Sequence, residues 1–249
     1  MLAAPSLWIL PQGPVAVLLE EARVHRALRH PYLHALVCRE LPEPDRALSE
    51  VFLQLMPWVA ALRPAMGSIA GRVGSETLAH EAELAAGVLD PHAKAALLDA
   101  ELGHLSGYSH LELYVEGLNL MGLDGAWEEA DRFTKRTWTH LRRFNRMTEH
   151  ADPLHALGAS VLGTHLIFPE VATMLMAALK DHPRGVEAAE LLGARNVLVR
   201  HTQDDVLQAV EVLSAQPQGL RRLAGGRTLA LDALAHLFDG LMEKAWRGD

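Results

Sequence analysis

The chain has 249 residues, of which 49% are hydrophobic, and a formal net charge of −8 at pH 7. This acidic balance argues against a general affinity for nucleic acid or for anionic membranes, so we expect neither as a partner. The only cysteine, Cys38, cannot form an internal disulfide, and no secretory signature is visible, which together favour the reducing cytoplasm. No apolar run approaches the length needed to cross a bilayer, since even residues 171–180 are closed by Asp181 and His182.

The N-terminal half of the chain reads as an arm followed by helices. Residues 1–13 are apolar but short and broken by prolines, so we expect an arm packed on the body of a domain that spans 14–249. Residues 14–34 have helical apolar spacing, which the pair His30-Pro31 should interrupt because a residue before proline is pushed away from the α region. A second helix is predicted over 44–65, with a kink at Pro57.

The middle of the chain contains the most unusual stretch. Asp90 and Pro91 are a good N-cap and first residue for a helix that runs into residues 97–123, where glycines should bend it. Residues 126–148 are amphipathic and strongly charged, which predicts a solvent-facing helix.

The last part is again helical in pattern. Pro153 should begin a helix in which Pro169 is an irregularity, and another helix is predicted over 185–213. After a turn-rich break at 216–226 comes a final helix, whose leucines are either core or a homodimer contact. No stretch shows the alternation of a strand, and we find neither an internal repeat nor a long linker. The sequence therefore predicts a single all-α domain.

Potential metal ligands gather in two places. Within residues 97–123, Glu101, His104 and His110 offer a carboxylate and imidazoles, a mixture that suits iron, manganese or zinc. Near the C-terminus, His201 and Asp205 lie on one helical face together with Gln208. We expect these two helices to face each other across the core. In an unbroken helix Glu101 and His110 would be half a turn out of phase, so a shared metal requires a bend between them.

These residues resemble the signature of the iron-containing redox enzymes of the haem-oxygenase-like superfamily. In that family a Glu-x-Gly segment precedes His-x-x-Leu and a glycine at the helix end, a later helix carries a glutamate four residues before a proline, and a further helix carries His-x-x-x-Asp-x-x-His. The matching positions here are Glu101, Gly103, His110, Leu113, Gly122, His165, His201, Asp205 and Gln208.

The resemblance implies a helical bundle that activates oxygen at carboxylate-bridged iron. Its ligands would be Glu101, His110, His201 and Asp205, with His165 in place of the family's glutamate and Gln208 in place of a histidine. A mononuclear site, a site completed by His104 and a vestigial site all remain open. The implied function is that of a metal-dependent oxidase or oxygenase acting on a small, largely apolar molecule.

A haem-degrading relative of that family also fits the pattern. Gly103 and Gly107 resemble the glycine-rich bend that haem oxygenases lay across the haem plane, and His25 or His30 would then be the axial ligand of the iron. TenA-type thiaminases and the pyrroloquinoline-quinone synthase share the same fold. The thiaminases rely on a cysteine late in the chain, whereas Cys38 comes early.

Each candidate ligand also has a structural interpretation. Glu101 can lie at the surface, and His110 can be the first residue of a helix that Ser109 caps. His201 and Asp205 can be a surface pair. A lone histidine such as His165 in an apolar segment is often a hydrogen-bonded core residue. The alternative function from another class is therefore a non-catalytic helical protein that binds a small molecule after losing part of the metal site.

Overall fold

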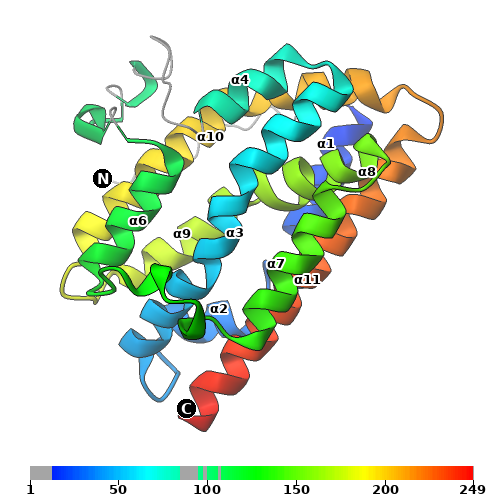
Figure 1. Cartoon of the computed structure of the whole chain (residues 1–249). Helices are drawn as coiled ribbons and strands as arrows, with labels where there is room; N and C mark the ends of the chain where they lie inside the picture. The colour runs from blue at the N-terminus through cyan, green and yellow to red at the C-terminus, as the bar shows by residue number, and fades with distance from the viewer. Residues whose placement is uncertain (1–12, 85–94, 98–99, 106–107, 249) are drawn as a thin grey trace.

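Helices make up the architecture of the computed structural model, which describes residues 13–84, 95–97, 100–105 and 108–248 (Figure 1). No strand occurs within these ranges, as the sequence predicted. The expected N-terminal arm and the expected helix start at Asp90 and Pro91 lie outside the described residues.

The chain enters the bundle through three helices that each have a proline in their first turn: α1 (Pro14–Arg23), α2 (Pro31–Val37) and α3 (Pro44–Val73). His30 caps α2, because its Nδ1 accepts a hydrogen bond of 3.2 Å from the backbone N–H of Tyr32. The predicted interruption at His30-Pro31 is confirmed, although α1 already ends seven residues earlier.

Helix α3 is longer than the sequence predicted. It continues through Pro57 and Pro64 and ends only at Gly74, which adopts the left-handed φ of 66°. Each proline removes one backbone hydrogen bond, but the apolar face of the helix stays buried past residue 65, at Met66 and Ile69, and this packing outweighs the loss.

Three short elements follow, α4 (Glu76–Leu84), the 3₁₀ turn η1 (Gly103–Leu105) and α6 (His110–Leu120). Helix α6 begins with a capping box. The Ser109 hydroxyl accepts from the Glu112 N–H at 3.1 Å, and the Glu112 carboxylate accepts from the Ser109 N–H at 2.7 Å. The predicted cap at Ser109 is thus confirmed.

The predicted helix over 126–148 is correct only in its second half. The structure has two 3₁₀ turns, η2 (Ala126–Glu128) and η3 (Ala130–Arg132), and then α7 (Lys135–Thr148). Helix α7 starts there because the Thr134 side chain accepts a hydrogen bond of 3.1 Å from the Thr137 N–H.

A long apolar segment then crosses the core as α8 (Pro153–Leu157), the π-helix η4 (Gly158–His165) and α9 (Phe168–Leu179). By length and composition residues 153–179 could cross a membrane, which corrects the expectation that no run is long enough. The bundle buries 72% of the relevant window, so the apolar character of this segment is explained by the core.

Two long helices complete the fold, α10 (Gly185–Ser214) and α11 (Gly219–Arg247). Figure 1 shows α10 beside α4 and α6, and α11 beside α7. The break predicted at 216–226 is much shorter, because α11 already starts at Gly219. Leucines 231, 234, 237 and 241 of α11 are core residues, while Leu229 and Trp246 are exposed.

Helix α11 lies unusually close to the α8–η4 segment because of glycines on both sides. A Cβ on Gly158 would lie 2.0 Å from the Leu223 carbonyl oxygen, and a Cβ on Gly226 would lie 1.9 Å from that of His155. Any side chain at these positions would push the backbones apart. This contact fixes η4, and with it His165, in the centre of the bundle.

Candidate functional site

Two ionisable side chains meet in the middle of the core. His165, the last residue of η4, is fully buried, and Glu81 of α4 is 1% exposed. The His165 Nε2 atom lies 2.7 Å from the Glu81 Oε1 atom. Burial of charged groups is tolerated when they are paired, and this pair joins α4 to the central segment of the bundle.

The surroundings keep Glu81 ionised. Burial by itself would raise the pKa of Glu81, but the facing His165 ring, assisted by the Thr202 hydroxyl of α10, outweighs burial and lowers that pKa below its ordinary value. His165 and Glu81 therefore form a close polar pair in the core, and the Thr202 hydroxyl is a further polar neighbour of the carboxylate.

The sequence analysis missed Glu81, although a signal was present. Glu81 lies three residues from both Leu78 and Leu84, and all three are buried on one face of α4. A carboxylate at helical spacing within an apolar face is either paired or functional. Glu81 was not predicted as a site residue because its segment does not match the family motif.

The face that α10 turns to the core is not the one predicted. His201 and Asp205 are exposed, and so is Gln208. The buried positions with the same spacing begin six residues earlier, at Arg195, Val199 and Thr202. None of these three side chains offers a carboxylate or an imidazole to a metal.

The other predicted ligands do not converge either. Glu101 is exposed, and its φ of 61° places it at the left-handed position that ends a helical turn, where the Leu102 N–H donates to the Leu97 carbonyl at 2.7 Å. His104 is exposed in η1, and His110 is the first residue of α6, with a side chain that is not among those described. Of the six proposed metal ligands, the structure places only His165 in the core among those whose side chains it describes.

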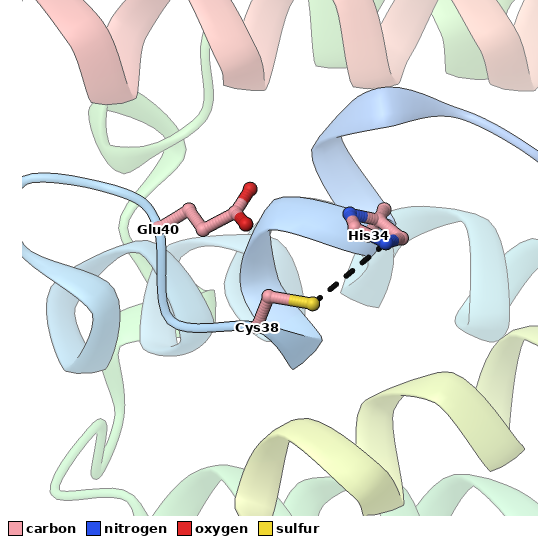
Figure 2. Close-up of side chains that lie close together, drawn as sticks. All are labelled: His34, Cys38 and Glu40. Carbon is pink, nitrogen blue, oxygen red and sulfur yellow. Dashed lines mark hydrogen bonds between the residues drawn. The ribbon is translucent and has the colours of Figure 1, made fainter.

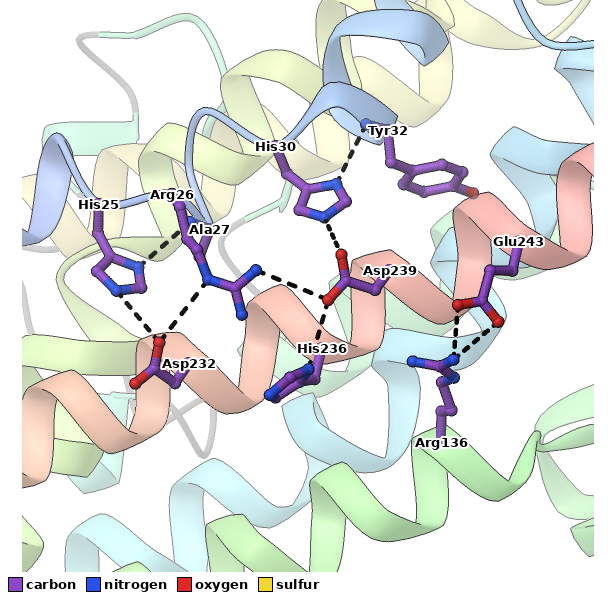
Figure 3. A network of polar contacts seen from close by, with 10 residues as sticks. All are labelled: His25, Arg26, Ala27, His30, Tyr32, Arg136, Asp232, His236, Asp239 and Glu243. Atoms are coloured by element: carbon purple, nitrogen blue, oxygen red, sulfur yellow. Dashed lines mark hydrogen bonds and ion pairs between the residues drawn. The ribbon is translucent and has the colours of Figure 1, made fainter.

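Both candidate axial ligands of the haem alternative lie beside a carboxylate of α11. His30 Nε2 lies 3.0 Å from the Asp239 carboxylate, and His25 Nε2 lies 3.5 Å from that of Asp232 (Figure 3). The Nδ1 atoms of both rings accept backbone hydrogen bonds, so all four nitrogens are engaged. Both histidines face α11, whereas Gly103 belongs to a segment whose Leu105 packs on α10; Gly107 lies outside the described residues.

A buried arginine marks a second polar point in the core. Arg195 of α10 is 1% exposed, and its Cζ atom lies 3.3 Å from the centre of the Phe168 ring on α9. Its Nε and Nη1 atoms have no hydrogen-bond partner among the described residues. Burial lowers the pKa of Arg195 to about 9, an effect that the nearby Tyr114 opposes.

Arg195 lines a pocket of about 670 Å³, which we call the α3–α4 pocket. Its walls come from α3, α4, the start of α6 and α10, and most of the lining side chains are apolar. The lining includes Leu62, Arg63, Ser68, Ala82, Glu83 and Leu111. Ala82 and Glu81 are neighbours on α4, so the pocket and the buried pair share this helix.

A different group of donors lies at the surface. His34, Cys38 and Glu40, at the end of α2 and in the following loop, have ligand atoms within 4.8 Å of one another, and Cys38 Sγ lies 3.7 Å from His34 Nε2 (Figure 2). Within the described residues this is the one group of three such side chains close enough to share a metal. All three are exposed. Its His-x-x-x-Cys-x-Glu spacing is readable in the sequence, but the sequence analysis did not single it out.

A further buried histidine lies away from the pocket. His140 of α7 packs its ring at 5.7 Å from that of Trp58. Burial lowers the pKa of His140 to about 4, an effect that a backbone contact with Ala233 only partly offsets. The ring is therefore neutral at physiological pH and acts as a packing residue of the α7–α11 contact.

Among the side chains that the structure describes, the core pair does not by itself fit a carboxylate-bridged dinuclear iron centre. Glu81 and His165 are two donor side chains, whereas such a centre is held by several carboxylates and imidazoles. Their 2.7 Å contact also leaves no space for an ion between them. We therefore derive no chemical step from iron.

Comparison with known proteins shows the fold and nothing finer. No protein-family model matches the chain, and no curated protein matches it. It is similar to the crystal structure of a CADD-like protein of unknown function from Nostoc punctiforme PCC 73102, with a TM-score of 0.60 and 16% sequence identity over 94% of this chain and 96% of that one. The chain thus shares the all-helical bundle fold of that protein, and the all-α fold class that the sequence predicted is confirmed.

Proposed function

We propose that this protein binds a small, largely apolar molecule in the α3–α4 pocket and does not act as a dinuclear iron oxidase. The observation that carries the proposal is the pocket itself. Its volume of about 670 Å³ lies within the range of small-molecule sites, and its wall is mostly apolar.

The polar groups of the pocket support binding over catalysis. The Ser109 hydroxyl already accepts a hydrogen bond from the Glu112 N–H in the capping box, so its role is structural. No base within the described lining residues lies in hydrogen-bond contact with this hydroxyl, so an activated nucleophile is not formed there.

The exposed Cys38 thiol, which is not in a disulfide, further supports a reducing compartment such as the cytoplasm.

The pocket is tested with N-phenyl-1-naphthylamine, a neutral apolar dye whose fluorescence rises on leaving water. We expect saturable binding to the full chain, and loss of that binding in Ser68→Trp, because the indole fills the pocket from an exposed position of α3. The matched control is Val186→Trp, which adds the same side chain at a site 73% exposed outside the pocket. Binding that Ser68→Trp leaves unchanged would contradict the proposal.

The second candidate function is the metal-dependent oxidase that the sequence motif suggested. One observation favours it: Glu81 and His165 bring a carboxylate and an imidazole together in the core, and both are side chains that bind iron. Elemental analysis of protein from iron-supplemented cells tests it. Near-stoichiometric iron that is lost in Glu81→Ala would support the oxidase, and iron far below one per chain would exclude it.

A further inference from the structure

Arg195 places a charge that has no carboxylate partner among the described residues at the wall of a mostly apolar pocket. Its side chain is 1% exposed, and no carboxylate forms an ion pair with it within the described residues. The stacking contact of 3.3 Å on Phe168 covers one face of the guanidinium plane, and its Nε and Nη1 atoms have no hydrogen-bond partner among the described residues. Buried guanidinium groups are ordinarily paired, so an arginine of this kind indicates a missing anion.

The position of Arg195 shows where that anion would come from. The arginine is the contribution of α10 to the α3–α4 pocket, while the surrounding wall includes Leu62, Ala82 and Leu111. A ligand that enters this pocket therefore meets apolar surface over most of its area and one buried guanidinium group. Guanidinium N–H donors match the oxygens of a carboxylate or sulfonate.

The remaining charges of the pocket limit the ligand to one negative charge. Arg63 and Glu83 both line the pocket, and both are exposed, so their opposite charges balance at the solvent side. A second anionic group on the ligand would find no buried cation among the described lining residues and would lie near the Glu83 carboxylate.

Building on the proposed function, we infer that the ligand of the α3–α4 pocket is an apolar monoanion whose carboxylate or sulfonate group is held by the N–H edge of Arg195. The apolar body of the ligand packs on the α3, α4 and α6 walls. The stacked Phe168 ring keeps the guanidinium plane fixed, so that the Arg195 side chain loses little conformational entropy when the ligand binds.

Two dyes with the same ring system test the inference. 8-Anilinonaphthalene-1-sulfonate differs from N-phenyl-1-naphthylamine by the sulfonate, so the ratio of their dissociation constants isolates the anion. We expect the wild-type chain to bind the sulfonated dye at least about tenfold more tightly than the neutral dye, because a charge-assisted hydrogen bond contributes about that much affinity. Arg195→Met should bring the two affinities together while binding of the neutral dye persists, and the control Arg142→Met, at an exposed position of α7, should leave the ratio unchanged.

The possible outcomes separate this inference from the proposed function. If wild type binds both dyes equally, and both in a way that Ser68→Trp abolishes, the pocket is a binding site but the anion preference is wrong. If neither dye binds in the pocket, the proposed function fails and the inference fails with it. A sulfonate preference that Arg195→Met retains would also overturn the inference. Unchanged circular dichroism of each variant shows that it is folded.

Discussion

Glu81 on α4 and His165 on η4 form a buried pair, with 2.7 Å between Oε1 and Nε2. The pair joins a short helix to the core segment of the bundle. Because α4 is only nine residues long, it is held beside the α3–α4 pocket by tertiary contacts, of which this pair is one.

The first prediction concerns this pair. His165→Leu leaves the Glu81 carboxylate buried without a partner, so the free energy of unfolding should fall by about 3–5 kcal/mol. The double variant Glu81→Leu/His165→Leu removes both charges and should recover most of the loss. Urea unfolding at pH 7 measures both values. A double variant as unstable as His165→Leu would contradict the prediction, because the unpaired Glu81 carboxylate would then not be the cause of the loss.

The pair should also respond to acid in a defined direction. The pKa of Glu81 in the folded chain is lowered, so its stabilising contribution is present above the ordinary pKa of a glutamate and is lost as pH falls through the lowered value. The difference in unfolding free energy between wild type and the double variant should therefore change only at strongly acidic pH.

His140 predicts a second pH dependence, at higher pH. Its pKa in the folded chain is about 4, against 6.5 for an unperturbed histidine, so the folded state favours the neutral ring. The resulting stability is complete above pH 6.5 and is lost as pH falls toward 4, by about 2 kcal/mol between pH 6.5 and 5. In urea unfolding, His140→Leu should reduce the pH dependence of the unfolding free energy over this interval. His201→Leu, at an exposed position, should leave that dependence unchanged.

Arg195 predicts a conflict between binding and stability. A buried guanidinium without a partner costs desolvation energy, so Arg195→Met, which keeps much of the volume, should stabilise the ligand-free chain by about 1–4 kcal/mol. Thermal unfolding in the absence of any dye measures this. A lower melting temperature in Arg195→Met would mean that the contact with Phe168 stabilises the fold, and that Arg195 needs no anion.

The close approach of α11 to η4 gives a packing prediction. Gly226→Ala would place a methyl group on the His155 carbonyl, so we expect a loss of about 3 kcal/mol in unfolding free energy. Gly71→Ala is the matched control, because nothing lies within 4 Å of its Cβ position in α3. That variant should be neutral or stabilising by up to about 1 kcal/mol.

The sequence predicted the fold well because helical periodicity and prolines are local signals. The break at His30-Pro31, the cap at Ser109 and the helix start at Pro153 depend on a few neighbouring residues, and all three are present. The boundaries that failed depended on tertiary packing. Helix α3 runs through Pro57 because its apolar face remains in the core, which no local pattern announces.

The site was predicted poorly because it depends on which face of α10 is buried. His201 and Asp205 have the right spacing for a metal face, but the core is reached by Arg195 and Thr202. Apolar neighbours lie near both sets, so periodicity could not choose between them. His165 was predicted to be either a ligand or a paired core residue, and its partner Glu81 comes from a segment that the motif did not cover.

A crystal structure of the full chain with 8-anilinonaphthalene-1-sulfonate tests the central claim most directly. We predict that the dye occupies the α3–α4 pocket with its sulfonate within hydrogen-bond distance of Arg195 Nε or Nη1, and that the contact between Glu81 and His165 persists. A sulfonate directed to solvent, a dye bound elsewhere, or a metal ion between Glu81 and His165 would contradict the account.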